Sequence, residues 1–422
     1  MGITKVKDNM SETGKVASMR RSPPACFDTI EHLEDATAPD YLTPAQRNDF
    51  DMAREFLQAY TGSLGTFTSY RRDVERLLLW TWFIAEQSLE EIKRGDIEDF
   101  IRFCQKPPRA WLGDHKTPRF HVIDGLRQPN PGWRPFVATV SKSAHKMGQL
   151  PDKAHYSASN SAIKQLLAIT GSFFQFLQME EYTVANPVAL IRQKSKFVQK
   201  RQSHTSVRRL SQQQWQTLIE TAEQMAEEQP QSHERTLFII SALYGMYLRI
   251  SELVASERWM PTMNDFHKDH NGLWWFTTVG KGNKERQIAV SDTMLAALKR
   301  WRKYQGFSAL PTPADNTPLF PLHRGQGALG NTTHVRNIVQ ACFDRAIERL
   351  AEQGHRDEAE AMMDATVHWL RHTGISEDVK TRPREHVRDD AGHSSSAITD
   401  RYVDVELKER HKSAKMKKIR SE

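Results

Sequence analysis

The most informative stretch of the chain is Gly392-His393-Ser394-Ser395-Ser396-Ala397-Ile398-Thr399-Asp400-Arg401-Tyr402. It places a tyrosine nine positions after a histidine. A second pattern, His368-Trp369-Leu370-Arg371-His372-Thr373, lies shortly upstream. On a helix, His368 and Arg371 would share one face because they are three residues apart. Imidazole, guanidinium and phenol groups at such spacing predict a phosphate-binding site with a phenol nucleophile.

The second pattern also admits a zinc interpretation, because His368 and His372 have the i, i+4 spacing of helical zinc ligands. It lacks the glutamate that follows the first histidine in catalytic zinc motifs, and no cysteine ligands lie nearby. We therefore expect no metal at this position and expect His372 to support the other site residues.

A further candidate residue is Arg249, in Leu248-Arg249-Ile250-Ser251-Glu252-Leu253. Apolar residues before it and an amphipathic turn after it place the guanidinium where two helices meet. A buried arginine needs an anionic partner. That partner is either a bound phosphate or Glu252, and the spacing alone does not decide between them.

A glycine-rich segment, Gly280-Lys281-Gly282-Asn283-Lys284, lies between two β-prone runs at 273–279 and 287–290. Glycine and asparagine between such runs predict a hairpin. The segment lacks the spacing of a nucleotide-binding phosphate loop. A lysine at a hairpin tip suits insertion into a DNA groove, although a solvated turn lysine would have the same sequence.

Taken in this order, the patterns resemble those of the tyrosine recombinase (phage integrase) family. The segment 248–253 is similar to that family's first arginine box, and 280–286 is similar to its hairpin lysine motif. The resemblance covers about residues 205–410 and extends more weakly over 44–190. It places the catalytic set at Arg249, Lys281, His368, Arg371, His393 and Tyr402, with Glu252 and His372 in support.

The resemblance implies a mainly α fold that forms a two-domain DNA clamp. One domain would be a helical core-binding domain. The other would be a mixed, mainly α-helical catalytic domain with a small antiparallel β-sheet or hairpin. The implied partners are double-stranded DNA carrying a recombination site and other copies of the chain in a synaptic tetramer. A partner recombinase or an accessory protein is a further expectation.

The implied activity is that of a site-specific recombinase. It would cut and rejoin DNA through a 3′-phosphotyrosyl intermediate and exchange strands through a Holliday junction, for integration, excision, resolution or transposition of a mobile element. The implied roles are Tyr402 as nucleophile, His368 as proton acceptor, Arg249 and Arg371 as phosphate clamps, Lys281 as leaving-group acid and His393 as hydrogen-bond donor. No cofactor is expected, because two arginines can neutralise the charge that Mg²⁺ neutralises in kinases.

Two other interpretations use the same residues. A topoisomerase-like or hairpin-forming enzyme would nick and rejoin DNA, and would relax supercoils without any specific site. A DNA-binding accessory protein with a remnant catalytic set would form no covalent bond to DNA. The polar helical core-binding domain and the Gly392-His393 pair favour the recombinase over the first of these, and the presence of every catalytic residue type speaks against the second.

The sequence departs from the family's pattern in several places. Met246 and Tyr247 are bulky where the family has small residues, and Asp390-Ala391 stand where it has leucines. The segment 379–390 is unusually polar, and the proline-rich insert 105–155 has no counterpart in the compact members. These differences concern local packing and DNA contacts and remove no catalytic residue.

Periodicity and composition divide the chain into segments. They are an irregular N-terminal tail (1–43), a helical core-binding domain (44–191) that contains the insert 105–155, a basic linker (192–209), a catalytic domain (210–406) and a basic C-terminal tail (407–422). Helical periodicity is clearest at about 48–60, 67–82, 96–103, 159–179, 236–248, 291–305, 332–353 and 366–376. Ser211 followed by Gln214 predicts a capping box. The C-terminal tail fits either a helix that docks on a neighbour or a disordered basic segment.

The net charge of +7 is unevenly distributed. Residues 105–155, 192–209 and 407–422 are strongly basic, whereas the rest of the chain is acidic overall. Segregated positive charge favours a polyanion partner, although solvated stretches would also be basic. The linker residues expected on DNA are Lys194, Lys196, Lys200, Arg201, Arg208 and Arg209. The aromatic residues of the insert, Trp111, Phe120, Trp133 and Phe136, fit either DNA contacts or a small core.

Cysteine usage and apolar runs bear on the compartment. The three cysteines are scattered, which fits buried thiols in a reducing compartment better than a disulfide frame. No apolar run approaches the ~20 residues that span a bilayer. The N-terminus has neither an apolar signal core nor a myristoylation pattern. We therefore expect a cytoplasmic protein without a membrane partner.

Overall fold

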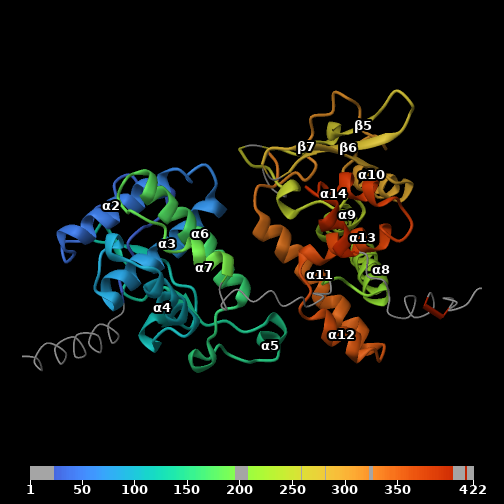
Figure 1. Cartoon of the computed structure of the whole chain (residues 1–422). Helices are drawn as coiled ribbons and strands as arrows, with labels where there is room; N and C mark the ends of the chain where they lie inside the picture. Colours follow the sequence, from blue (N-terminus) through green and yellow to red (C-terminus); the bar gives the residue numbers. More distant parts are fainter. Residues whose placement is uncertain are drawn as a thin grey trace, which may run out of the picture. The chain divides into compact units, whose positions relative to one another are not determined.

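The computed structural model describes residues 23–194, 208–257, 259–280, 282–322, 327–402 and 414–415. It divides the chain into two compact units, Met1–Gln202 and Ser203–Glu422, each with its own hydrophobic core (Figure 1). Helices make up most of both units and the sheets are small, so the predicted mainly α fold is confirmed. No described helix is both long and apolar enough to cross a membrane.

The first unit is built around three long helices, α2, α3 and α6, which pack against one another. Its helices are α2 (Pro44–Gln58), α3 (Leu64–Trp80), α4 (Arg94–Gln105), α5 (Lys142–Lys146), α6 (Asn160–Met179) and α7 (Ala189–Lys194). Thr43 and Ser159 begin α2 and α6 by accepting hydrogen bonds from backbone N–H groups of the first turn. Phe173 and Phe174 of α6 lie in the core, as the periodicity predicts.

Residues 23–43, which were expected to belong to an irregular tail, pack into this first unit. They contain one short 3-10 helix, η1 (Ile30–His32), and no longer element. Phe27 stacks on Phe50 of α2 with ring centroids 4.7 Å apart, and Leu33 is also buried. Because these large apolar groups are removed from water, this stretch is part of the core rather than a tail.

The insert 105–155 packs into the first unit and contains only short strands and helices. Its strands form two pairs: β1 (Leu112–Gly113) with β4 (Phe136–Val137), and β2 (Phe120–Ile123) with β3 (Leu126–Pro129). Trp111, Trp133 and Phe136 are buried and Phe120 is half-buried. These aromatic residues therefore serve as core residues, but the core that they join is the main hydrophobic core of the first unit rather than a small separate one.

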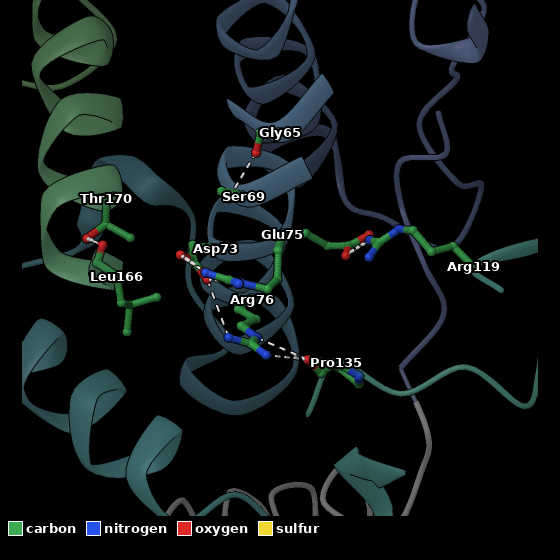
Figure 2. A network of polar contacts seen from close by, with 10 residues as sticks. Gly65, Ser69, Asp73, Glu75, Arg76, Arg119, Pro135, Leu166 and Thr170 are labelled. Atoms are coloured by element: carbon green, nitrogen blue, oxygen red, sulfur yellow. Dashed lines mark hydrogen bonds and ion pairs between the residues drawn. The ribbon is translucent and has the colours of Figure 1, made fainter. Parts of the chain in front are cut away.

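Polar contacts from α3 fasten the insert, as Figure 2 shows. The guanidinium of Arg76 donates two hydrogen bonds to the carbonyl of Pro135, over 3.0 and 2.8 Å, and lies 4.4 Å from the centre of the Phe136 ring. One residue earlier, the buried carboxylate of Glu75 pairs with Arg119. Glu75 also accepts a 2.6 Å hydrogen bond from the backbone N–H of Cys26. One carboxylate thereby joins α3, the insert and the N-terminal stretch.

The second unit combines packed helices with a three-stranded sheet at one end (Figure 1). Its helices are α8 (Gln212–Glu228), α9 (Pro230–Gly245), α10 (Asp292–Tyr304), α11 (Thr332–Glu352), α12 (Arg356–Met362), α13 (Val367–Asp378), α14 (Arg384–Ala391) and α15 (Ser396–Thr399). The antiparallel sheet has the order β5 (Phe266–Lys268), β6 (Trp274–Val279), β7 (Glu285–Ala289), which confirms the predicted hairpin and adds an edge strand. The capping box predicted at Ser211 and Gln214 begins α8.

Helices α9 and α13 approach each other most closely at Gly374. A Cβ atom on this residue would lie 2.1 Å from the carbonyl oxygen of Tyr244 in α9, so a larger residue would push the two helices apart. The close crossing brings Arg249, which follows α9, near His368 and Arg371 on α13, because all three lie around the same helix pair. A glycine therefore sets the spacing of the candidate site.

Replacing Glu75 tests how the insert is held. In Glu75→Ala, Arg119 remains largely buried without its carboxylate, and we expect a loss of about 3–5 kcal/mol in the free energy of unfolding of the first unit. Urea denaturation measures this loss. The matched control, Glu98→Ala, removes more exposed ion pairs with Arg94 and Arg102 and should cost no more than about 1 kcal/mol. Equal small losses in both variants would contradict the anchoring role.

Candidate active site

A buried carboxylate, Glu252, organises the basic groups of the second unit. Its side chain is 1% exposed and lies in the 3-10 helix η6 (Ile250–Glu252). Arg286 of β7 donates to both carboxylate oxygens, each over 2.8 Å. Arg249 donates through Nη1 over 3.0 Å and through its backbone N–H over 2.8 Å. Burial alone would raise the pKa of Glu252, but the hydrogen bonds and charges of the two arginines hold it below its ordinary value.

The pairing of Arg249 with Glu252 answers one question that the sequence left open. The ion pair exists, but the Arg249 side chain is still 31% exposed, whereas that of Arg286 is only 9% exposed. A guanidinium carries several N–H donors in a planar fork, so one shared carboxylate does not use them all. The ion pair and an external phosphate are therefore compatible partners for Arg249.

Arg371 of α13 is buried and bonds to backbone carbonyl oxygens. Its Nη1 donates to the carbonyl of Tyr247, and its Nη2 donates to the carbonyl of Ala391 over 2.6 Å. Burial, followed by the positive charge of Arg249, lowers the pKa of Arg371 to about 10, which leaves it cationic at neutral pH. A buried cation held by carbonyl groups favours an incoming anion, because the anion would offset its loss of hydration.

The three candidate histidines, His368, His372 and His393, lie close to these arginines. His368 and His372 are one turn apart on α13, with ring centroids 4.2 Å apart. Burial is the main cause that lowers the pKa of each histidine, and neighbouring charges add to it. The pKa falls to about 4 for His372 and for His393, and below its ordinary value for His368. At pH 7 all three imidazoles are therefore neutral and able to accept a proton.

Tyr402 ends the 3-10 helix η8 (Asp400–Tyr402) and is only 6% exposed. Its hydroxyl is hydrogen-bonded to Nδ1 of His372 over 2.6 Å. Its ring lies nearly parallel to that of His393, at 18°, with centroids 5.6 Å apart. Thr399, on α15, forms a 2.9 Å hydrogen bond with Nδ1 of His393. The phenol is thus held between two of the candidate histidines.

Gly392 lets the chain turn from α14 toward His393. Its φ of +63° lies in the left-handed region, and a Cβ atom there would come within 2.8 Å of Cδ of Arg286. Backbone conformation and space therefore both favour glycine. The turn is closed by the N–H of His393, which donates to the carbonyl of Arg388 over 3.1 Å. The Gly-His pair that stood out in the sequence is thereby a helix end that presents an imidazole.

The structure brings together five of the six residues predicted as catalytic: Arg249, His368, Arg371, His393 and Tyr402. The sixth, Lys281, lies outside the described residues, as do Lys196, Lys200 and Arg201 of the linker. Lys194 ends α7, and its side chain is outside the description. Arg208 is exposed and Arg209 is half-buried.

Sequence reasoning missed residues that hold the site together. Arg286 ends the hairpin motif 280–286 and could have been noticed there, because an arginine that becomes buried needs an acidic partner, which here is Glu252. Thr399 lies three residues before Tyr402 and carried no signal of its own. Tyr247 and Asp390 had been identified as departures from the family's pattern rather than as parts of the site.

Within the described ranges, no three His, Cys, Asp or Glu side chains gather closely enough to hold a metal ion. A groove of about 810 Å³ lies between α8, α9 and α10 and is lined by Trp215, Tyr244 and Arg300, among others. None of the five clustered candidates lines this groove, so its concave shape does not mark the chemistry.

Parts of the chain are similar to known proteins. Residues 208–409 match the phage integrase family. The tyrosine recombinase XerC of Chlorobaculum parvum (strain DSM 263 / NCIMB 8327) is 25% identical over 274 residues, which are 61% of this chain and 72% of that protein. The tyrosine recombinase XerC of Xanthomonas axonopodis pv. citri (strain 306) is 30% identical over 171 residues, which are 40% of this chain and 46% of that protein.

A solved structure shares the fold. The crystal structure of the XerH site-specific recombinase bound to palindromic difH substrate, a post-cleavage complex, aligns with 92% of this chain and 93% of that one, at 14% identity and a TM-score of 0.55. Residues 208–409 thus form a domain that matches the phage integrase family, and the chain resembles tyrosine recombinases over a longer stretch.

The lowered histidine pKa values can be measured directly. We expect the imidazoles of His372 and His393 to titrate near pH 4 in NMR spectra of the folded protein. In the unfolded chain they would take up protons near pH ~6.5. Since the unfolded state then binds more protons between about pH 6.5 and 4, these groups make folding stability fall as the pH drops through that window. Titration midpoints near 6.5 in the folded protein would contradict the burial of the site.

Proposed function

We propose that the chain is a site-specific recombinase that cuts and rejoins DNA through Tyr402. The proposal rests on the groups that surround the hydroxyl of Tyr402. The phenol oxygen bonds to neutral His372, and the cationic side chains of Arg371 and Arg249 lie close by. A nucleophile, a proton acceptor and a place for a phosphate are the parts that phosphodiester transfer requires.

In the proposed reaction, the phenol oxygen of Tyr402 attacks the scissile phosphorus. A 3′-phosphotyrosyl bond forms while the bond from phosphorus to the 5′-oxygen breaks. Arg249 and Arg371 donate hydrogen bonds to the non-bridging oxygens as negative charge grows on them. Lys281 supplies a proton to the departing 5′-oxygen, and His393 donates a hydrogen bond to the phosphate. The freed 5′-hydroxyl of a second strand can reverse the reaction, because the phosphodiester energy is kept in the covalent bond.

The phenol proton has two candidate acceptors. The family resemblance assigns this role to His368, whereas the 2.6 Å hydrogen bond joins the hydroxyl to His372. Both imidazoles have lowered pKa values and are neutral at pH 7. We propose that His372 holds the hydroxyl and accepts its proton at the start of attack, and that His368 contacts the phosphate.

DNA binding is proposed to involve both units, which would close around the duplex as a clamp. The linker residues Arg208 and Arg209 and the rest of the stretch 192–209 would follow the phosphates. In the insert, the buried aromatic residues are unsuited to base contacts, but Lys106 and Lys116 are exposed and basic. Binding should weaken steeply with salt, because each neutralised phosphate releases counterions. Strand exchange through a four-way junction would require a tetramer on DNA, for integration, excision, resolution or transposition.

Covalent capture of DNA tests the proposal. Nicked duplexes with a randomised core are incubated with the protein, and adducts are separated on a denaturing gel and sequenced. We expect the wild-type chain to capture a defined sequence through its 3′ phosphate, and Tyr402→Phe to capture none. The control Tyr244→Phe changes a partly buried tyrosine of α9 and should keep the adduct. An adduct that survives in Tyr402→Phe would overturn the nucleophile, and no wild-type adduct would favour the accessory-protein interpretation.

The acceptor role of His372 has a separate test. On the captured sequence, His372→Gln should reduce the single-turnover rate of adduct formation by about 100-fold or more, since general base catalysis contributes about that much. The wild-type rate should change little between pH 8 and about pH 5, because His372 stays unprotonated there. A normal rate in His372→Gln, together with a strong loss in His368→Gln, would return the role to His368.

A further inference from the structure

The two backbone carbonyl groups that bind Arg371 lie in segments that one network of polar side chains connects. The first carbonyl is that of Tyr247, just after α9, and the second is that of Ala391, at the end of α14. Ala391 directly follows Asp390, whose own carbonyl accepts a 3.0 Å hydrogen bond from Nε of Arg286. The orientation of the Arg371 guanidinium therefore depends on how Tyr247 and Asp390 are placed relative to each other.

Arg382, between α13 and α14, bridges these two residues. Its Nη1 donates to the phenol oxygen of Tyr247 and to Oδ2 of Asp378, each over 3.0 Å. Its Nη2 donates to Oδ2 of Asp390 over 2.5 Å. The Tyr247 hydroxyl in turn donates to Oδ2 of Asp378. We call these four residues, Tyr247, Asp378, Arg382 and Asp390, the bridge.

The backbone of Tyr247 has an unusual conformation, which the hydrogen bonds of its side chain help to maintain. Its φ is +50°, in the left-handed region that a bulky residue enters only at an energetic cost. This conformation points the carbonyl at Arg371, while the ring is buried beside Ile375, Val387 and Tyr402. Hydrogen bonds to Asp378 and Arg382 at the far end of the same side chain would offset the cost.

Asp390 is tied on its other side as well. Its Oδ1 accepts a hydrogen bond from the backbone N–H of Ala289 in β7, over 3.2 Å. The carboxylate is 8% exposed, so its two partners, Arg382 and Ala289, hold it in a fixed place. The same residue thus connects the sheet, which carries Arg286, with the helix end that carries Ala391 and Gly392.

We propose that Arg382 is a positioning residue for the phosphate-binding guanidinium of Arg371, acting through the Tyr247 and Asp390 side chains. This inference rests on the proposed function, since it assigns the bridge to the step in which Arg371 contacts the phosphate. The same role explains two departures from the family's sequence pattern, Tyr247 and Asp390. A tyrosine at 247 and an aspartate at 390 are polar partners of one arginine, and that arginine lies in the unusually polar segment 379–390.

The test uses variants that keep the charge and the packing. Arg382→Lys retains a cation but loses the planar fork that reaches Tyr247, Asp378 and Asp390 at once. Tyr247→Phe removes only the hydroxyl. The matched control is Arg349→Lys, which alters an arginine of α11 paired with Glu220 elsewhere in the same unit. Each variant is assayed in single-turnover cleavage with excess protein over the duplex that the wild-type chain captures.

We expect the rate constant of adduct formation to fall about 10- to 100-fold in Arg382→Lys and in Tyr247→Phe, because a small displacement of a clamping group costs that much. The dissociation constant for the duplex should stay within about twofold. The double variant should be no slower than the slower single variant, since both break one connected set. Arg349→Lys should react like the wild type.

The outcomes separate the possible failures. A merely structural role would lower the fraction of protein that reacts and leave the rate constant unchanged, and this would overturn the positioning role alone. Losses that multiply in the double variant would overturn it too, because they would show two independent effects. A wild-type chain that captures no DNA would overturn the proposed function, and the positioning role with it.

Discussion

The buried carboxylate of Glu252 is the constraint on which the candidate site depends. The guanidinium groups of Arg249, Arg286 and Arg371 lie close together. Burying any of these cations without an anionic partner costs free energy. Glu252 is bonded to two of them and is almost fully removed from solvent. Breaking such a buried pair leaves uncompensated charge and is strongly destabilising. Positive charge remains at the exposed side of Arg249 and at Arg371. This charge is available to bind a phosphate.

The sequence predicted those features that depend on local pattern. The hairpin around Gly280, the cap at Ser211 and the helix bearing His368 and Arg371 all follow from neighbouring residues, and the structure contains them. Helix α14 was not predicted, because it is short and polar and buries only Val387, Asp390 and Ala391. The contacts of Arg286 and Arg382 could not be predicted from the sequence. They join positions that only the crossing of α9 and α13 and the sheet bring together.

The insert shows a second limit of prediction from sequence, which concerns charge. Composition marks residues 105–155 as a proline-rich and basic segment, but composition does not say which of its charges are used internally. Arg119 is paired with Glu75, and Arg127 with Asp28, so part of the positive charge serves to fasten the insert to its own unit. A net charge counted along the chain therefore overestimates what is left for DNA.

The position of the covalent bond between protein and DNA decides whether Tyr402 is the nucleophile. The captured complex is digested with nuclease and protease, and the nucleotide-bearing peptide is identified by tandem mass spectrometry. If Tyr402 is the nucleophile, we expect a single modified residue, Tyr402, joined to a 3′ phosphate. A nucleotide on another side chain, such as Tyr247, or a linkage to a 5′ phosphate would contradict this assignment.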